Sequence, residues 1–186
     1  MSNSDIRIPP LDVEEFTPEQ AELVGNWTHL VFSRVIARRP DMYRIFVPWI
    51  EQLIAKTKLP PRDRQVLVLR TLALGNDTYE FHHHVMISKN AGISDEDIAA
   101  FAKGSEALSG FEQVLACAAE ELVSDQFIAD ATWAALAERY GEEQLMEVVF
   151  LVGCYNTMAM LTRSFGMPLE GADEEFDKIQ NLREYT

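Results

Sequence analysis

Apolar residues recur at every third or fourth position along most of this chain, and this spacing constrains the fold more than any other feature of the sequence. It predicts helices with one apolar face, such as the segment that opens at Pro40 and carries Phe46, Trp49 and Leu53 on one side. No stretch shows the alternation of apolar and polar residues between tight turns that a strand requires. The sequence therefore predicts an all-α protein.

Capping residues, prolines and glycines divide the chain into about eight expected helices. Thr17-Pro18-Glu19-Gln20 combines an N-cap, a proline at the first helical position and a capping-box glutamine, so one helix begins there and runs to about Arg38. The later helices are expected at residues 40–54, 59–74, 77–90, 94–104, 109–123, 130–140 and 142–165, with Ser109 and Asp130 as N-caps of the sixth and seventh.

Length and composition favour one domain over residues 1–186, since 47% of the 186 residues are apolar and can build one core. Residues 1–16 contain Pro9 and Pro10 and show no sustained period, so we expect an extended arm that lies on a neighbouring subunit or on the domain surface. Residues 170–186 are polar with a weak apolar period, and we expect a tail that can form a helix and dock on a partner subunit.

Acidic residues outnumber basic ones by a wide margin, since 16 Lys and Arg against 30 Asp and Glu give a net charge of −14. A surface of this sign repels phosphate backbones and anionic lipid headgroups, so we expect neither nucleic acid nor a membrane as a partner. A small-molecule substrate that is anionic stays compatible with the charge, because one local arginine in a pocket can oppose the global field.

Targeting and redox features indicate the cytoplasm. The first residues lack a basic region followed by an apolar run, so we expect no signal peptide. The most apolar stretch, residues 145–161, contains Glu147 and Asn156 and is shorter than the roughly 20 apolar residues of a membrane span, so we expect a buried core helix. Cys117 and Cys154 lie far apart inside apolar helical patterns, as expected for unpaired core thiols in a reducing compartment.

Three of the four histidines stand together in the segment Tyr79-Glu80-Phe81-His82-His83-His84, beside a carboxylate. Adjacent side chains on a helix point about 100° apart, so the three imidazoles cannot converge, whereas Glu80 shares a face with His83 and His84. A carboxylate next to an imidazole fixes its tautomer and raises its pKa to near neutral. The segment therefore predicts general acid and base catalysis.

Other interpretations of this segment stay open. An exposed histidine run, a hydrogen-bonded core histidine and an ordinary Glu80–His84 ion pair would each leave it without catalytic function. Glu80-x-x-His83 also fits half of a di-iron site, but the second half is missing because Asn26 stands where His29 would need a glutamate. We therefore expect no bound metal, with a single ion held by His83 or His84 together with His29 or Glu80 as the alternative.

Three segments, Leu59-Pro60-Pro61-Arg62-Asp63-Arg64-Gln65, residues 79–84 and Ala91-Gly92-Ile93-Ser94-Asp95-Glu96-Asp97-Ile98, resemble the carboxymuconolactone decarboxylase family in order and spacing. The resemblance covers roughly residues 40–103. It implies an AhpD-like helical bundle and a homo-oligomer, commonly a trimer or a hexamer. It also places the carboxylate and imidazole of the family pattern on Glu80 and His84.

One branch of this family, the alkyl hydroperoxide reductase D-like peroxidases, carries Cys-x-x-Cys-x-x-x-His. Alignment on His84 and Gly92 puts Asp77 and Glu80 where those cysteines stand, and Gln65 where the branch has a glutamate. A carboxylate cannot form the disulfide on which dithiol turnover depends, so the resemblance implies a branch without dithiol peroxidase activity. The chain also lacks the G-x-G-x-x-G, Walker and G-x-S-x-G motifs.

The decarboxylase branch needs no cofactor, because the unsaturated lactone of the substrate accepts the electrons released with carbon dioxide. The resemblance thus implies a cofactor-free lyase or isomerase, carboxy-lyase-like, acting on a small lactone or aromatic-derived carboxylic acid in aromatic compound catabolism. We expect His84, oriented by Glu80, to protonate the substrate carbon, with His83 as a further catalytic candidate. The expected substrate-binding residues are Gln65, Arg62, Arg70 and Tyr155. The alternative is a non-catalytic ligand-binding or assembly protein of the same fold.

Overall fold

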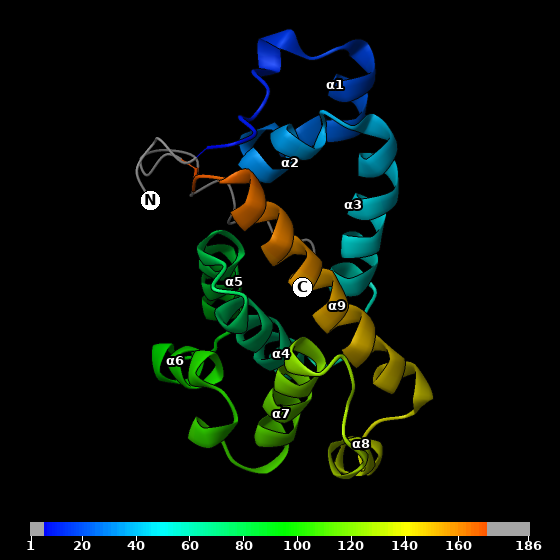
Figure 1. Cartoon of the computed structure of the whole chain (residues 1–186), viewed down its shortest axis with the longest axis vertical. Helices are drawn as coiled ribbons and strands as arrows, with labels where there is room; N and C mark the ends of the chain where they lie inside the picture. Colours follow the sequence, from blue (N-terminus) through cyan, green and yellow to red (C-terminus); the bar gives the residue numbers. More distant parts are fainter. Residues whose placement is uncertain (1–5, 171–186) are drawn as a thin grey trace. The chain divides into compact units, whose positions relative to one another are not determined.

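Helices make up the part of the chain that this computed structural model describes, residues 6–170, and no strand lies in that part (Figure 1). Nine α-helices and three short 3-10 helices are present in it. They divide into two compact units, residues 6–55 with 161–170 and residues 56–160. The prediction of an all-α protein is confirmed, with one α-helix more than the eight expected.

The extra helix arises in the first unit, where the helix expected from Thr17 to Arg38 is divided in two. α1 (Pro18–Val24) begins with the predicted capping box, in which the Thr17 amide donates to Gln20 Oε1 at 2.9 Å and the Gln20 amide donates to Thr17 Oγ1 at 3.2 Å. The helix ends at Gly25, whose φ of 51° favours glycine. A 3-10 turn (Gly25–His29) then separates α1 from α2 (Val31–Ile36).

The third helix of this unit, α3 (Pro40–Ala55), buries Tyr43, Phe46 and Leu53. These positions follow the three-and-four spacing that the sequence pattern predicts. Val24 of α1, Ala37 and Tyr43 form the buried core cluster of the unit, and partly buried apolar side chains from residues 11–47 pack against it.

Residues 6–16, the described part of the expected arm, lie on their own unit. The amides of Arg7 and Ile8 both donate to the carbonyl of Phe165, at 2.9 and 3.1 Å. The Leu11 amide donates to the Arg34 carbonyl at 3.3 Å. Of the two arrangements expected for the arm, these contacts correspond to packing on the surface of the same chain.

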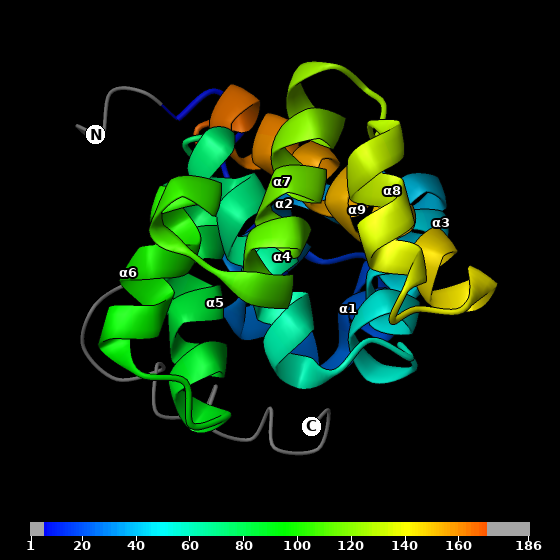
Figure 2. The ribbon, with the colours of Figure 1, turned by 90° about the horizontal axis from the view of Figure 1, so that it is seen from below.

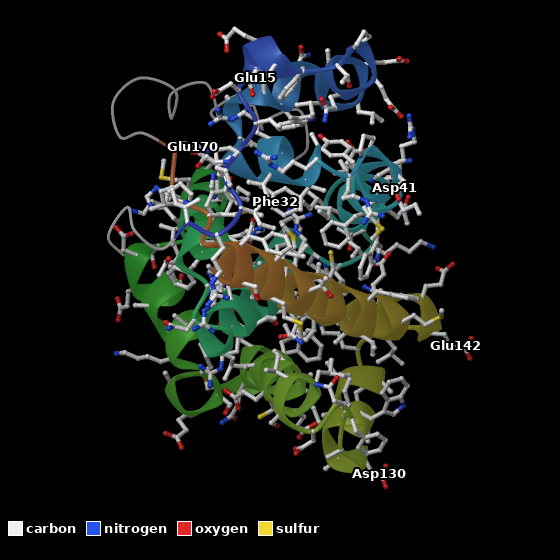
Figure 3. The ribbon with its side chains drawn as sticks, turned by 45° about the horizontal axis from the view of Figure 1, so that its top comes forward. Glu15, Phe32, Asp41, Asp130, Glu142 and Glu170 are labelled. Atoms are coloured by element: carbon white, nitrogen blue, oxygen red, sulfur yellow. The ribbon has the colours of Figure 1, made fainter. Side chains whose placement is uncertain are left out.

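A distant carboxylate caps α2. The residue before this helix, Leu30, has no side chain that can cap it, and Glu170 Oε1 accepts a hydrogen bond from the Val31 amide at 2.7 Å (Figure 3). A negative charge at a helix N-terminus is favourable because the first amides lack partners within the helix. The tail expected at residues 170–186 lies outside the described residues beyond Glu170.

The second unit is built around α4 (Pro61–Leu74), which is buried along most of its length. α5 (Thr78–Asn90), α6 (Asp95–Lys103) and α7 (Gly110–Ser124) all lie against α4 (Figures 1 and 2). α8 (Asp130–Ala137) lies against α7, and residues 142–160 of α9 (Glu142–Phe165) belong to the same unit. Because three helices cover α4, its polar side chains are buried together with its apolar ones.

Two of the predicted caps in this unit are correct. Asp77 Oδ1 accepts from the amides of Tyr79 and Glu80 at 2.9 and 3.3 Å, and Ser94 Oγ accepts from the Asp97 amide at 3.1 Å. These caps fix the starts of α5 and α6 at the predicted positions.

The other two predicted caps differ from the structure in part or in full. Ser109 is the N-cap residue of α7, as predicted, but its side chain makes no capping hydrogen bond, and the Glu112 carboxylate accepts from Arg62. Asp130 is the first residue inside α8, and the N-cap is Ala129, whose amide donates to Glu121 Oε2 at 2.8 Å. The helix also ends at Ala137, three residues before the predicted Tyr140.

α9 has the predicted bounds, and in the described part of the chain it is the one helix whose length and composition would suffice to cross a membrane. Half of that apolar stretch is buried in the protein, and core helices of soluble proteins pass the same test. One side of α9 is therefore buried in the core, as predicted. Its other side stays exposed, with Met146, Phe150 and Met160 among the exposed apolar residues.

Candidate functional site

Polar side chains from three helices gather in the interior of the second unit. The group comprises Arg64 and Gln65 on α4, Glu80, His83 and His84 on α5, and Tyr155 on α9, and we call these six residues the polar cluster. All six are less than 9% exposed. Five of the six were predicted as site residues: Glu80, His83 and His84 from the histidine segment, together with Gln65 and Tyr155. The sequence analysis did not predict the sixth, Arg64.

His84 is held by an amide. Its Nδ1 lies 3.0 Å from Gln65 Oε1, and Ser88 Oγ donates to the same oxygen at 3.3 Å. Because a carbonyl oxygen only accepts, Nδ1 carries the proton and the lone pair of the neutral ring lies on Nε2. The ring also meets Tyr155 edge to face, with centroids 4.8 Å apart and planes at 90°. Gln65 thus fixes the tautomer of His84, a role that the sequence pattern assigned to Glu80.

Burial lowers the pKa of His84 to about 3, and the charges of Arg64 and His83 lower it further. The imidazole is therefore neutral at pH 7, and its free nitrogen can accept a proton but has none to give. The sequence predicted a His84 pKa near neutral, which differs from this value. That prediction considered the Glu80 carboxylate but neither the burial of the ring nor the charge of Arg64.

Glu80 lies close to α9. Burial raises the pKa of the Cys154 thiol to about 12, and the Glu80 carboxylate raises it further. Burial and the same carboxylate hold the pKa of Tyr155 well above its ordinary value. Glu80 is in the first turn of α5, where the helix dipole favours a negative charge. Its charge therefore acts on the side chains of α9 that face the polar cluster.

His83 bonds within its own helix. Its Nδ1 lies 2.8 Å from the carbonyl oxygen of Tyr79, so Nδ1 carries a proton and donates it to that oxygen. The His83 and Tyr79 rings stack at a tilt, with centroids 4.7 Å apart. His83 thus sits beside His84 with its tautomer set by the backbone.

Arg64 is the member of the polar cluster that sequence reasoning missed. Its side chain is buried, and burial lowers the pKa of the guanidinium. Its charge acts on both His84 and Tyr155. No local pattern separates Arg64 from Arg62 and Arg70, which lie on the same helix and are less buried.

Arg62, a predicted substrate-binding residue, lies outside the polar cluster. Its Nη1 donates to Asp97 Oδ2 at 2.9 Å, its Nε donates to Glu112, and its guanidinium carbon lies 5.1 Å from the centre of the Phe101 ring. The hydrogen bond from Arg62 is the main reason that the pKa of Asp97 is lowered to about 2. Arg62 therefore ties the first turn of α4 to α6 and α7.

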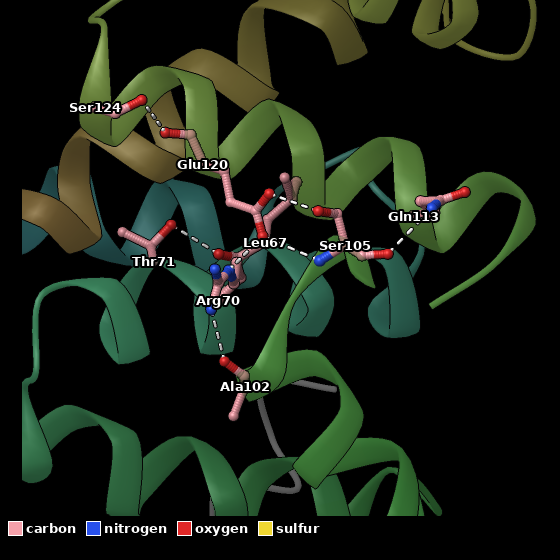
Figure 4. A network of polar contacts seen from close by, with 8 residues as sticks. All are labelled: Leu67, Arg70, Thr71, Ala102, Ser105, Gln113, Glu120 and Ser124. Carbon is pink, nitrogen blue, oxygen red and sulfur yellow. Dashed lines mark hydrogen bonds and ion pairs between the residues drawn. The ribbon is translucent and has the colours of Figure 1, made fainter. Parts of the chain in front are cut away.

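Arg70, the other predicted arginine, is likewise committed to a structural network (Figure 4). Its Nε donates to Glu120 Oε1 at 2.7 Å and its Nη1 donates to the Ala102 carbonyl at 2.8 Å. Glu120 also accepts from the amide and hydroxyl of Ser105, at 3.0 and 2.7 Å. Gly104, with a φ of 98°, lies so close to this ion pair that a Cβ there would be 2.3 Å from Glu120 Oε1. Arg70 thus stabilises the connection between α6 and α7.

The metal alternative gains no support in residues 6–170, where no group of three or more His, Cys, Asp or Glu side chains is placed to hold an ion. His29 belongs to the first unit, with Nδ1 3.0 Å from the Asn26 carbonyl. Both cysteines are unpaired, Cys154 buried and Cys117 partly buried.

Comparison with known proteins agrees with this fold. Among solved structures, the chain is similar to an uncharacterised peroxidase-related protein with an alkylhydroperoxidase AhpD core from Ralstonia eutropha, with a TM-score of 0.76 and 17% identity over 91% of this chain and 93% of that chain. It is also similar to a protein of unknown function from Agrobacterium tumefaciens, named as a candidate antioxidant defence protein AhpD, with a TM-score of 0.64 and 16% identity over 72% of this chain and 94% of that chain.

Curated proteins give no match to the sequence. At the identities of the two solved structures, the likeness establishes the fold alone. Residues 40–120 match the family model of the carboxymuconolactone decarboxylases, and this range includes α4 and α5 with five of the six residues of the polar cluster. Over residues 40–120 this chain is therefore similar to the carboxymuconolactone decarboxylases, and its fold is similar to that of the two solved structures.

Proposed function

We propose that this protein is a cofactor-free lyase or isomerase acting on a small lactone or aromatic-derived carboxylic acid, with decarboxylation as its reaction. The observation that carries the proposal is the burial of a guanidinium, a carboxylate and a neutral imidazole in one polar cluster: the charge of Arg64 acts on His84, and the charges of Arg64 and Glu80 both act on Tyr155, whose ring meets His84. The match of residues 40–120 to the family model of the carboxymuconolactone decarboxylases supports the same class of chemistry.

Arg64 is the proposed anchor for the substrate carboxylate. A guanidinium can donate two parallel hydrogen bonds to a carboxylate, and such a pair is strongest where water is excluded. A bound carboxylate also changes His84, because it offsets the positive charge that lowers the pKa of the imidazole. Anion binding at Arg64 therefore favours proton uptake at His84, and proton uptake favours anion binding.

The proposed reaction balances with one proton. The bond between the carboxylate carbon and the ring carbon breaks, its electron pair passes into the unsaturated lactone, and carbon dioxide leaves. The pair then returns to the ring carbon as that carbon takes a proton from His84 Nε2, which took it up with the bound anion. Gln65 holds the ring through Nδ1, and Glu80, whose charge acts on the adjacent Tyr155, is the proposed second catalytic residue.

A second candidate is a non-catalytic ligand-binding or assembly protein of the same fold. The observation that favours it is the burial of His84, 4% exposed, with Nδ1 already bonded to Gln65. A hydrogen-bonded polar group inside a core can serve stability alone.

A thiol peroxidase is a weaker candidate, although both similar structures carry peroxidase or antioxidant names. Asp77 and Glu80 stand at the cysteine positions of that branch, and the raised pKa keeps Cys154 protonated at neutral pH.

The deciding experiment is a screen of lactones and ring-cleavage acids for release of carbon dioxide. We expect turnover of at least one compound, lost in Arg64→Met and in His84→Ala and kept in His82→Ala, a matched change at a neighbouring histidine outside the polar cluster. Unchanged turnover in both His84→Ala and Arg64→Met refutes the proposal. Calorimetric binding of a carboxylic acid without turnover of any compound supports the second candidate instead.

A further inference from the structure

The exposed side of α9 forms a continuous apolar face. Met146, Val149, Phe150 and Met160 are 41% to 58% exposed, and they recur at the three-and-four spacing of one helix face. We call this set, together with the exposed Gly153 between them, the outer face of α9. Single exposed apolar residues are common on proteins, but a row of four on one helix marks a surface that binds a partner.

Gly153 stands at the middle of this face, inside a helix of 24 residues. A glycine in a helix interior costs about 1 kcal/mol relative to alanine. Nothing in residues 6–170 accounts for it, because a Cβ added there would meet no atom of those residues within 4 Å. A residue without a side chain at an open position instead permits close approach by another backbone.

Two polar side chains near the outer face, Thr157 and Glu147, are hydrogen-bonded within the chain. Thr157 Oγ1 donates to the Gly153 carbonyl at 2.9 Å. Glu147, the one charged residue between positions 144 and 162, accepts from Thr57 Oγ1 at 2.8 Å and from the Lys58 amide at 2.7 Å. Covering the outer face would therefore bury apolar surface without leaving a charge unpaired.

We propose that the outer face of α9 binds the same face of a second copy of this chain, with the two helices antiparallel and crossing at Gly153. The pattern is self-complementary: Met146 lies seven residues before Gly153 and Met160 seven after, so each meets the other across a two-fold axis. Phe150, three residues before the glycine, lies opposite Asn156 of the second copy.

The charges at the helix ends select the antiparallel arrangement. The first turn of α9 carries Glu142 and Glu143, and the last turn carries Arg163. In an antiparallel pair the acidic turn of one copy faces the basic turn of the other, and the helix dipoles oppose, whereas a parallel pair would place acid against acid. The net charge of −14 acts against association as a whole, so added salt should strengthen the pair.

Sedimentation equilibrium of the full chain tests the proposal. We expect a dimer or an even-numbered oligomer whose dissociation constant rises at least about 30-fold in Phe150→Glu, since each change occurs twice in a two-fold contact. Phe127→Glu, the same change at an exposed aromatic residue of the α7–α8 connection, is the matched control and should leave the constant unchanged. A monomer at all concentrations, or an oligomer that Phe150→Glu does not weaken, overturns the proposal.

Disulfide cross-linking tests the register in a Cys117→Ser background, with Cys154 left buried. The pair Met146→Cys with Met160→Cys should form intermolecular disulfides, whereas Met146→Cys alone should not. Cross-linking by Met146→Cys alone would mean a parallel pair and overturn the arrangement. Flotation of the wild type with phosphatidylcholine vesicles, lost in Phe150→Glu, would assign the face to a membrane and also overturn the proposal.

Discussion

Mild acid should destabilise this protein through His84. The pKa of His84 lies near 3 in the folded chain, below its ordinary value of 6.5, because the buried ring cannot hold a charge beside Arg64. Unfolding therefore takes up a proton wherever the pH lies between these two values. The contribution of neutral His84 is complete above pH 6.5 and is lost progressively as the pH falls toward 3.

The size of the effect at pH 5 depends chiefly on the pKa of His84 in the unfolded chain, since pH 5 is well above its pKa in the folded chain. A drop from pH 7 to pH 5 should remove about 2 kcal/mol of the free energy of unfolding through this residue alone. The comparison is with His84→Asn, which keeps a donor near Gln65 Oε1 but does not titrate. Urea denaturation of both proteins at both pH values, followed by circular dichroism, gives the difference.

The refuting result is an equal loss of stability on acidification in the wild type and in His84→Asn. It would mean that His84 is charged in the folded state or reaches solvent, and the account of the polar cluster would fail. His82→Asn is the control for removing a histidine from the same helix. It should retain the full pH dependence of the wild type, because His82 is more exposed than His84.

Three further predictions concern single side chains. Gln65→Glu should raise the pKa of His84 by about two units, because a carboxylate replaces the neutral acceptor at Nδ1, and NMR titration of the imidazole signals measures it. Gly104→Ala should cost about 1–3 kcal/mol in thermal or urea unfolding, through positive φ and a clash with the Arg70–Glu120 pair, while Gly141→Ala should cost little. Cys154 should not react with a thiol reagent at pH 8 until the protein unfolds, since its pKa is about 12. An unchanged pKa of His84 in Gln65→Glu would contradict the first prediction. Equal stability of the two glycine variants would contradict the second, and rapid modification of Cys154 would contradict the third.

Local signals in the sequence predicted the helices well where the capping chemistry was complete. The capping box at Thr17 and the caps at Asp77 and Ser94 are all present. At Ser109 the predicted position is correct but the capping box is absent, and the glutamate of that box is bonded to an arginine 50 residues away in sequence. Such competition between a local partner and a distant one depends on the packed structure, and no local pattern contains it.

The site illustrates the same limit for charged residues. Spacing singled out Glu80, His83 and His84, and the family resemblance added Gln65; all four are buried in the polar cluster. Arg62 and Arg70, the expected substrate-binding arginines, form ion pairs with residues of α6 and α7, whereas Arg64 on the same helix belongs to the polar cluster, and packing decides this difference. The pKa of His84 likewise depends on burial, which spacing along a helix does not reveal.

The position of Arg64 also resolves how a strongly acidic chain could bind an anion. The net charge of −14 lowers the rate at which anions arrive, because repulsion acts over roughly a Debye length from the surface. The attraction of a buried guanidinium acts at contact and is little screened by salt. For the proposed substrate class, the association rate should therefore rise with ionic strength while the dissociation rate changes little. Affinity that falls steeply with salt would instead place the anion at the surface, away from Arg64.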